Sequence, residues 1–438
     1  MWIAVALIAS LGASPRIEAA TFAEEVARLA TPLVDASGQD AARSVGLVVV
    51  VVTRAGTQAF GFGALTAGGA TPPDGDTYFQ IGSISKSLTG LILASVIESS
   101  GGTILADTPV NSLLAADLRM PGFGAQPVTL EHLATHHGGL PAFPNNMTGP
   151  PFYPAQGYAR AQLSNYLAGF ALSAPPGTVY EYSNTGFGLL ALALGDQAGV
   201  APYSALLGAR LTGPLGMGDT GLNEAPFATG LGARLAQGYR STGTALVPMA
   251  LSDMGVLEGA GEVISTGNDM GKLLRVFSGL DPFPVAGAVA QAVAPRAPGA
   301  PGTQTGYGLD ISSLTNGVVQ YEKAGLVAGY TAYIAFRREP ATGVIVLSNR
   351  GQHQAVVPLA RQVLALLTPP VVSIGMAAPD LAQISFTAAA RLSYEVQTSS
   401  DLIDWAAFTT LTNSADNPAN LSTTIPMSPP RGFVRLRY

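Results

Sequence analysis

Lysine is rare in this chain, and one lysine stands three residues after a serine. The 438 residues include only three lysines, and Ser83-Ile84-Ser85-Lys86 is the only Ser-x-x-Lys sequence. Residues three apart share a face of a helix. A serine hydroxyl becomes a good nucleophile when a neighbour takes its proton, and a desolvated lysine with a lowered pKa can do so. The motif therefore predicts Ser83 as nucleophile and Lys86 as its base; the alternative is a solvent-facing serine beside a lysine whose amine reaches water.

A second candidate is Tyr182-Ser183-Asn184, the only Tyr-x-Asn sequence in a chain with 14 tyrosines. It lies between a Pro-Gly turn at 175–177 and a predicted helix over 186–194. A tyrosine oxygen beside a lysine can relay protons, and an asparagine amide can hold a substrate carbonyl. Taken alone, the same residues are typical of a turn tyrosine followed by an asparagine that caps a helix.

A third candidate, Lys323-Ala324-Gly325, ends a predicted strand and opens the turn to the next strand. Gly325 lets the backbone approach a ligand closely, and Lys323 supplies a positive charge that can bind a substrate carboxylate. The alternative is an ordinary surface lysine on an edge strand.

The elements that must position these motifs are predicted from hydrophobic periodicity. We expect an amphipathic helix over 21–44, then a hairpin formed by a strand over 45–53 and a short strand through Phe60. From about 83 to 300 the pattern is helical with many Gly and Pro breaks, and it begins with a buried helix whose apolar stripe is Ile84, Leu88, Leu91, Ile92 and Val96. Strand patterns return before a helix over 355–367, at 307–311, 318–323, 330–337 and 343–348.

The simplest assembly of these elements is an α+β fold. The N-terminal hairpin pairs with the C-terminal strands in one antiparallel sheet flanked by helices, and the middle of the chain forms an inserted helical domain. Beyond Pro369-Pro370 the composition shifts to Ser, Thr and Asn with short alternating runs, which predicts a small all-β module. We expect Trp405 and Phe408 in the core of that module. The predicted domains are 21–368 and 369–438.

Composition and charge exclude several classes of protein. Hydrophobic residues make up 47% of the chain and charged residues 11%, which is not the composition of a disordered protein. The net charge is -6 and no basic run occurs, so no nucleic-acid partner is expected. Because the chain has no cysteine, disulfide bonds and thiolate chemistry are excluded.

The N-terminal segment resembles a signal peptide over residues 1–20. Residues 1–11 are nearly all apolar and small residues follow, although no Lys or Arg precedes the apolar run. The alternative is a buried N-terminal helix. No other stretch of about 18 apolar residues occurs, so no integral membrane span is expected beyond this segment. These features predict a secreted or periplasmic protein.

Taken together, in the order in which they occur, the three motifs resemble those of the serine β-lactamases and penicillin-binding proteins. The chain looks most like the class C β-lactamase branch, which includes D-alanyl-D-alanine carboxypeptidase/endopeptidases and some esterases. The resemblance covers roughly residues 40–368, and the segments that carry it beyond the motifs are 79–82, 133–141, 180–181, 185–186, 214–217, 265–269 and 347–349.

The resemblance implies a role for each motif residue. Ser83 would form an acyl-enzyme, and Lys86 and Tyr182 would move its proton and later activate water. Asn184 would orient the substrate amide, and Lys323 and Gly325 would line the substrate site. The backbone N–H groups of Ser83 and Leu326 would form the oxyanion hole.

This chain departs from the family pattern at two positions. Many β-lactamases carry Thr or Ser where Ala324 stands, and that hydroxyl helps to bind the β-lactam carboxylate. Class C β-lactamases carry Gln where Phe143 falls. The absence of the hydroxyl at Ala324 argues against efficient β-lactam turnover, and the apolar ring of Phe143 suits a different acyl group. Lys323, in contrast, is the residue found in true β-lactamases and transpeptidases.

Glu131, His132, His136 and His137 include a His-x-x-x-His pair that could bind zinc. The only other histidine is His353, and there is no cysteine to complete a ligand set. The segment also matches the Thr-His-x-x-Gly-Leu-Pro turn of the family, which is structural. We therefore expect no metal site, and the resemblance implies no cofactor.

Three functions are compatible with these residues. The first is an enzyme that acts on β-lactams or on D-alanyl-D-alanine-type peptides of peptidoglycan. The second is a carboxylesterase on short acyl esters, which Ala324 and Phe143 favour. The third is a penicillin-binding or sensor protein that does not turn over, against which the complete set of motifs argues.

The composition shift at Pro369-Pro370 leads to a prediction about residues 369–438. Because these residues contribute no motif, a chain that ends at Thr368 should hydrolyse a soluble ester at a rate within about twofold of the full chain. The measurement is kcat/KM for both proteins, with circular dichroism to check folding. Loss of activity in a folded, shortened chain would show that the C-terminal residues help to build the site.

Overall fold

The computed structural model describes residues 21–314, 317–367, 372–378, 381–388, 393–399, 404–413, 419–426 and 433–437. They divide into two compact units: one over Leu29–Leu364, and one that contains the described residues before Leu29 and after Leu364. The predicted signal peptide and the Pro369-Pro370 boundary lie outside the described residues and stay predictions. None of the described helices combines the length and hydrophobicity that a membrane span requires.

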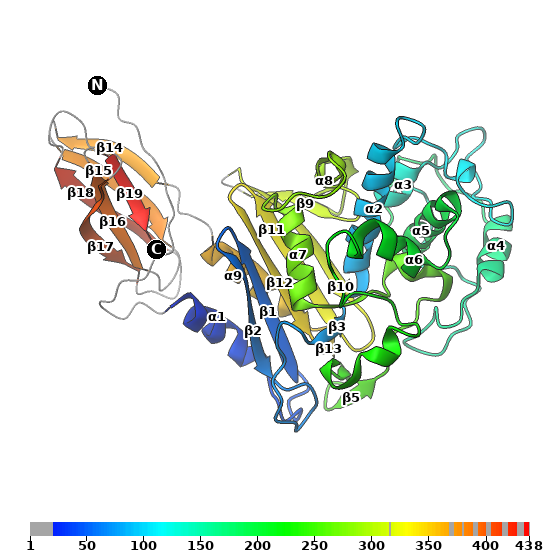
Figure 1. Cartoon of the computed structure of the whole chain (residues 1–438), viewed down its shortest axis with the longest axis horizontal. Coiled ribbons are helices and arrows are strands. Elements are labelled where there is room, and N and C mark those ends of the chain that lie inside the picture. Colours follow the sequence, from blue (N-terminus) through cyan, green and yellow to red (C-terminus); the bar gives the residue numbers. More distant parts are fainter. Residues whose placement is uncertain are drawn as a thin grey trace. The chain divides into compact units, whose positions relative to one another are not determined.

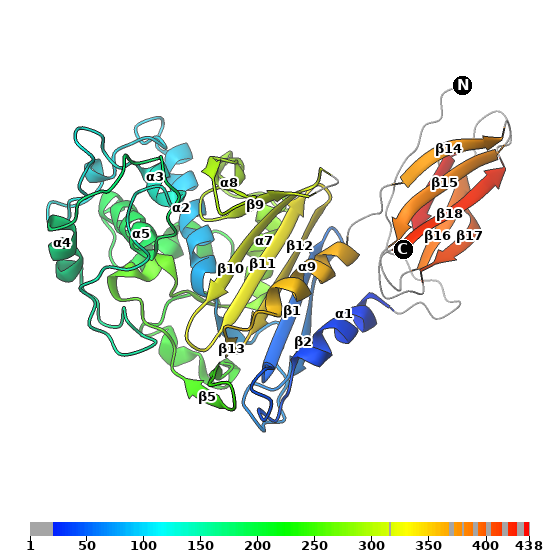
Figure 2. The same ribbon diagram turned by 180° about the vertical axis from the view of Figure 1, so that it is seen from behind.

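An eight-stranded sheet forms the centre of the first unit (Figures 1 and 2). In spatial order its strands are β2 (Gly56–Gly63), β1 (Gly46–Thr53), β12 (Ala341–Ser348), β11 (Thr331–Arg338), β10 (Val319–Leu326), β9 (Asp310–Ser313), β8 (Gln304–Thr305) and β7 (Ala297–Pro298). Neighbouring strands run antiparallel, and Val50 of β1 lies opposite Ile345 of β12. The predicted pairing of the N-terminal hairpin with the C-terminal strands is confirmed.

Helices cover both faces of this sheet, which explains the unbroken run of valines in β1. Residues 47–52 are almost completely buried, and a strand that is covered on both faces has no need of alternating polar positions. Helix α7 (Gly267–Phe277) packs against β1 and β12 and lies in front of the sheet in Figure 1, whereas α9 (Val356–Leu366) crosses the opposite face in Figure 2.

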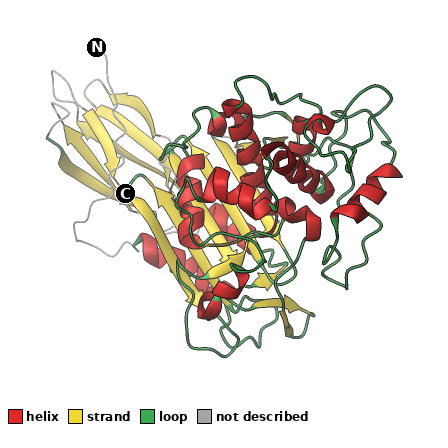
Figure 3. Cartoon of the chain, turned by 45° about the vertical axis from the view of Figure 1, so that its right-hand side comes forward, coloured by secondary structure: helices red, strands yellow, loops and turns green. Residues whose placement is uncertain are grey.

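The inserted helical domain surrounds one buried helix, α2 (Ser85–Ser99), on one side of the sheet (Figure 3). Every residue over 85–97 is buried, so α2 has no polar face, where an apolar stripe was expected. The physical reason is that it packs against several other segments: α5 (Asn184–Ala198), α6 (Tyr203–Leu207), η4 (Gly208–Thr212), α8 (Ala288–Val293) and the 3-10 helix η7 (Gly255–Ala260). The domain also contains α3 (Leu130–Ala134) and α4 (Arg160–Ala168).

Short strands connect the helical domain to the sheet. Strand β3 (Tyr78–Gln80) precedes α2 and pairs antiparallel with β6 (Ile264–Thr266), which precedes α7. A further three-stranded sheet consists of β13 (Arg350–Gly351), β4 (Gly238–Ser241) and β5 (Leu246–Met249).

Several predicted boundaries are wrong. Strand β10 continues to Leu326, so Lys323-Ala324-Gly325 lies within the strand rather than opening the turn, and α5 is longer than the helix expected over 186–194. The helix expected over 21–44 is α1 (Phe22–Ala30), followed by a 3-10 turn, because Pro32 cannot continue an α-helix. The strand expected over 307–311 begins only at Asp310, because a turn precedes it. In that turn Tyr307 N donates to Ala292 O (2.9 Å) and Gly308 has a φ of 70°.

The second unit contains two three-stranded sheets, β14-β15-β18 and β17-β16-β19. Their bounds are β14 (Val372–Ala378), β15 (Leu381–Ala388), β16 (Ser393–Ser399), β17 (Ala406–Thr412), β18 (Ala419–Pro426) and β19 (Phe433–Arg437). The core consists of Ile384, Phe386, Ala388, Tyr394, Val396, Ile425 and Leu436. The expectation that Trp405 and Phe408 lie in this core is wrong: Phe408 is 42% exposed and Trp405 is only partly buried. Both belong to the region of β17, an edge strand whose described side chains are exposed or half-buried.

Candidate active site

Ser83 lies in a 3-10 turn, Gly82–Ile84, between β3 and α2. Gly82 has a φ of 56°, and a Cβ atom at this position would lie 2.6 Å from Leu326 N. Only glycine therefore allows the turn to pack this closely against β10. Lys86 follows in the first turn of α2, on the same side of the chain as Ser83.

The amine of Lys86 is completely buried and meets three oxygen atoms. Nζ lies 3.1 Å from Ser83 Oγ and donates hydrogen bonds to Asn184 Oδ1 and Ala260 O, each at 2.6 Å. Desolvation lowers the pKa of Lys86; Tyr182 opposes this effect, and the positive charge of Lys323 adds to it. The alternative of an amine that reaches water is wrong. A lysine with a lowered pKa can accept a proton from a serine hydroxyl.

Tyr182 places its oxygen beside the same hydroxyl. Its Oη lies 2.7 Å from Ser83 Oγ, and its ring centroid lies 4.9 Å from Lys86 Nζ and 5.1 Å from Lys323 Nζ. Desolvation by itself raises the pKa of Tyr182, but the two lysine charges and the hydrogen bonds outweigh it, and the pKa is lowered. The tyrosine oxygen can therefore exchange a proton with Ser83 more readily than an ordinary phenol can.

Asn184 is the first residue of α5, and its side chain faces Lys86. The helix is capped by the preceding residue, because Ser183 Oγ accepts a hydrogen bond from Gly186 N (2.8 Å). The alternative in which Asn184 is the capping residue is wrong. Ser183 Oγ in turn donates to Pro141 O and Asn184 N donates to Ala142 O, so the turn 141–142 fixes the start of α5.

Lys323 is buried on β10 rather than exposed at the surface, so the surface alternative is wrong. Its Nζ lies 3.4 Å from Asp310 Oδ2 on β9. Desolvation by itself lowers the pKa of Lys323, but Asp310 and the nearby tyrosines outweigh it and the pKa is raised. The two lysines of the site therefore differ: Lys323 stays charged, whereas Lys86 is pushed toward its neutral form.

The backbone of β10 beyond Lys323 lies directly against the serine turn. A Cβ atom on Gly325 would lie 1.9 Å from Ile81 O, so no other residue fits there without a shift of the backbone. The register pairs β9 with β10 only as far as Glu322, so among the described residues no strand pairs with Lys323–Leu326 on that side. Ser83 and Leu326 thus lie close together beside an unpaired stretch of strand.

A cleft of about 620 Å³ opens in front of Ser83, which is the size of a typical small-molecule site. From the three motifs its lining includes Ser83, Tyr182, Asn184, Lys323 and Ala324, but neither Lys86 nor Gly325. The lining also includes Phe143, Tyr180, Met254, Asp310 and Leu326. Ala324 and Phe143, the two departures from the family pattern, therefore both face the substrate space.

The histidines near the site have other partners than a metal. His132 Nδ1 accepts a hydrogen bond from Thr129 N (3.2 Å) at the start of α3, and His136 Nδ1 accepts one from Ser183 N (3.1 Å). The ring of His136 packs against that of Tyr182, with centroids 4.5 Å apart. Within the described residues, no group of three or more His, Asp or Glu side chains is arranged to hold a metal ion.

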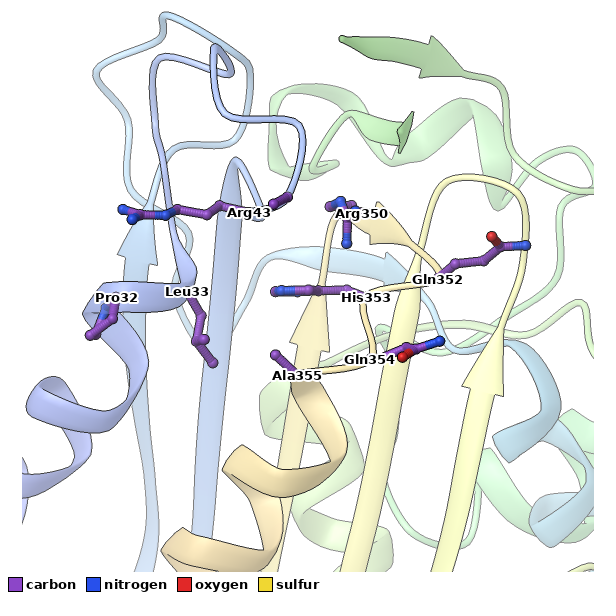
Figure 4. A pocket seen from close by; sticks show the side chains of 9 residues that line it. Pro32, Leu33, Arg43, Arg350, Gln352, His353, Gln354 and Ala355 are labelled. Carbon is purple, nitrogen blue, oxygen red and sulfur yellow. The ribbon is translucent and has the colours of Figure 1, made fainter. Parts of the chain in front are cut away.

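A second hollow, of about 360 Å³, lies at the N-terminal end of α9 (Figure 4). His353 projects into it beside Arg43 and Arg350 (Figure 4). Desolvation lowers the pKa of His353 to about 4, and its Nδ1 lies 2.7 Å from Ser44 Oγ. Because Ser44 is completely buried, its hydroxyl does not meet solvent, and this Ser–His contact holds the fold together rather than forming a second nucleophile.

Three groups of the site were not predicted from the sequence: the Asp310 carboxylate, the carbonyl of Ala260 and the ring of His136 beside Tyr182. A backbone carbonyl carries no residue-type signal. Asp310 stood at the end of an expected strand, and its position beside Lys323 follows only from the register of β9 with β10.

An antiparallel sheet flanked by helices, with an inserted helical domain and a serine turn against one strand, is the fold of the serine β-lactamase and penicillin-binding protein class. The chain matches the model of the β-lactamase family over residues 26–368. It belongs to the β-lactamase family.

Individual relatives share a modest sequence identity with this chain. The chain is 31% identical over 184 residues to the D-alanyl-D-alanine-carboxypeptidase/endopeptidase AmpH of Escherichia coli. The aligned segment covers 42% of this chain and 46% of AmpH. The match thus spans less than half the length of that relative. The chain is also 25% identical over 316 residues to a β-lactamase of Lysobacter lactamgenus, which covers 63% of this chain and 74% of the relative.

Solved structures share the fold. The β-lactamase/D-alanine carboxypeptidase of Yersinia pestis is 24% identical, with a TM-score of 0.64 over 78% of this chain and 98% of the other. The octameric penicillin-binding protein homologue of Pyrococcus abyssi is 21% identical, with a TM-score of 0.63 over 87% of this chain and 92% of the other. The fold class expected from the sequence is confirmed.

The electrostatic coupling of the two lysines leads to a prediction about pH dependence. A base must be unprotonated to work, so kcat/KM should rise with pH through the pKa of Lys86. Lys323→Met removes a nearby positive charge that lowers this pKa, so the rising limb should move to higher pH. The measurement is the pH profile of kcat/KM on an uncharged ester. Lys323→Arg keeps the charge and should leave the limb in place; a limb that stays or moves to lower pH in Lys323→Met would contradict the coupling.

Proposed function

We propose that the protein is a serine hydrolase that works through an acyl-enzyme on Ser83. The observation that carries this proposal is the pair of contacts at Ser83 Oγ, with Lys86 Nζ at 3.1 Å and Tyr182 Oη at 2.7 Å. A nucleophile within hydrogen-bond reach of its base, in a cleft of suitable size, is the arrangement that acyl transfer requires. Membership of the β-lactamase family supports the proposal.

In the first half of the reaction, Ser83 Oγ attacks the carbonyl carbon of the substrate. Its proton passes to Lys86 Nζ, either directly or through Tyr182 Oη. The bond from the carbonyl carbon to the leaving nitrogen or oxygen then breaks, and the leaving group takes up the proton. In the second half, water attacks the acyl-enzyme, loses a proton to the same groups, and releases the acid while Ser83 regains its hydroxyl proton.

The remaining motif residues bind and orient the substrate in this proposal. Backbone N–H groups of Ser83 and Leu326 stabilise the oxyanion, a contribution worth about 3 kcal/mol of activation free energy per donor in other enzymes. The amide of Asn184 orients the acyl group, and the absence of a side chain at Gly325 lets β10 lie directly against the serine turn, beside Ile81 O. Lys323 supplies the positive charge of the substrate site.

The substrates proposed first are β-lactams and D-alanyl-D-alanine-type peptides, small molecules or fragments of peptidoglycan. Support comes from the lysine at position 323 and from the names of relatives that act as β-lactamase or D-alanyl-D-alanine carboxypeptidase. Such substrates match the expected secreted or periplasmic location, which we retain as part of the proposal.

A carboxylesterase is the second candidate function, and two side chains in the cleft favour it. Ala324 offers no hydroxyl to a substrate carboxylate, and Phe143 presents an apolar ring where a polar acyl side chain would need a hydrogen bond. Both changes suit an uncharged, apolar acyl compound.

The proposed chemistry predicts covalent labelling of one peptide. A fluorophosphonate or a β-lactam should add its mass to the peptide that contains Ser83, and Ser83→Ala should abolish the adduct. Lys86→Arg should slow labelling by a factor of about 100 or more, because guanidinium cannot accept a proton at neutral pH. Lys272→Arg is the matched control, since Lys272 lies exposed on α7 and pairs with Asp269. The measurement is mass spectrometry over time. An adduct that still forms in Ser83→Ala would show that Ser83 is not the nucleophile.

The two substrate classes predict different activity profiles. Assays of nitrocefin, a D-Ala-D-Ala peptide and p-nitrophenyl esters on one preparation give kcat/KM for each. The first proposal expects measurable turnover of nitrocefin or the peptide, whereas the esterase expects turnover of short esters alone. A stable adduct on Ser83 with no turnover of any compound would instead identify a penicillin-binding or sensor protein.

A further inference from the structure

Asp310 is the only carboxylate within ion-pairing distance of Lys323 among the described residues. It is the first residue of β9 and lies opposite Glu322 in the register with β10, one position from Lys323. The Lys323 side chain is 4% exposed and that of Asp310 is 32% exposed. The charge of Lys323 is therefore buried, whereas its counter-ion is partly exposed to solvent and also lines the cleft.

The other cation that lines the cleft is also paired. Arg361, on α9, binds Glu322 through two hydrogen bonds, Nε to Oε1 at 2.9 Å and Nη2 to Oε2 at 2.7 Å. The charged side chains that line the cleft are Asp310, Glu322, Lys323 and Arg361. Two positive and two negative charges cancel, so the lining of the cleft as a whole carries no net charge.

A carboxylate that approached Lys323 would have to displace Asp310 or tolerate it a few ångströms away. Like charges at this separation repel strongly in a site with limited water. Ala324 adds no hydroxyl that could compensate with a hydrogen bond. A substrate that is uncharged at this end meets neither cost, because it leaves the Lys323–Asp310 pair intact.

We propose that Asp310 determines substrate specificity: by occupying Lys323, it disfavours substrates with a free carboxylate and selects acyl compounds that are uncharged on the leaving-group side of the scissile bond. The inference rests on the proposed acyl-enzyme chemistry at Ser83. It favours the second candidate, the carboxylesterase, over the β-lactams and free D-alanyl-D-alanine peptides proposed first, because those substrates carry a carboxylate. Suitable substrates are neutral esters and amides, such as an esterified or amidated D-alanyl peptide.

The test uses two substrates that differ only in this charge, a D-alanyl-D-alanine peptide with a free C-terminus and the same peptide as its C-terminal amide. In the full-length protein, Asp310→Asn should raise the ratio of kcat/KM for the acid to kcat/KM for the amide about tenfold or more. Taking the ratio cancels any change in the pKa of Lys86, which acts equally on both substrates. Asp107→Asn removes the same charge from an exposed site outside the cleft and should leave the ratio unchanged.

A binding measurement tests the inference even if turnover of the peptides is too slow to measure. With Ser83→Ala as background, calorimetry should show that Asp310→Asn tightens binding of the free acid about tenfold relative to the amide. Asp310→Ser repeats the test if the asparagine variant fails to fold. An unchanged ratio in both measurements would overturn the inference even if Ser83 is labelled, whereas absence of labelling at Ser83 would overturn the proposed function itself.

Discussion

The buried amine of Lys86 is the constraint on which the rest of the site depends. An ammonium group without a carboxylate partner loses hydration worth on the order of several kcal/mol when it is buried, so the fold must favour the neutral amine and satisfy its hydrogen bonds. The three oxygen contacts come from Ser83 in the serine turn, Asn184 at the start of α5 and Ala260 at the end of η7. These segments can hold their positions only if α2 is packed on every side, as it is.

The two lysines of the site show how one residue type acquires two properties from its surroundings. Both side chains are buried, and desolvation lowers the pKa of each. Lys86 has only uncharged partners within hydrogen-bond distance, so its pKa stays lowered, whereas Asp310 reverses the effect at Lys323. Each lysine also lowers the pKa of Tyr182, which lies between them. Acid–base chemistry at Ser83 and the charge of the cleft are therefore parts of one electrostatic system.

Strand β10 fixes the position of these charged groups relative to the sheet and the serine turn. It carries Lys323 within the sheet, and its glycine lies against the serine turn. In the described part of the chain, its last residues pair with a strand on one side only. The pairing of β1 with β12 completes this sheet, because it joins the N-terminal hairpin to the C-terminal strands. A change in the register of any of these strands would move Lys323 or Asp310 away from Ser83, because a slip of one residue turns each side chain to the opposite face.

The sequence by itself determined the three motifs, the α+β class and the pairing of the terminal strands, because these depend on residue type and on hydrophobic patterns within short segments. It could not determine the partners of those motifs. Asp310 beside Lys323, the carbonyl of Ala260 on Lys86 and the ring of His136 on Tyr182 all join segments that are distant in the chain. Likewise, hydrophobicity suggested that Phe408 is buried, whereas its place on an edge strand leaves it exposed. Only the tertiary structure decides which segments meet, and therefore which buried charges are paired.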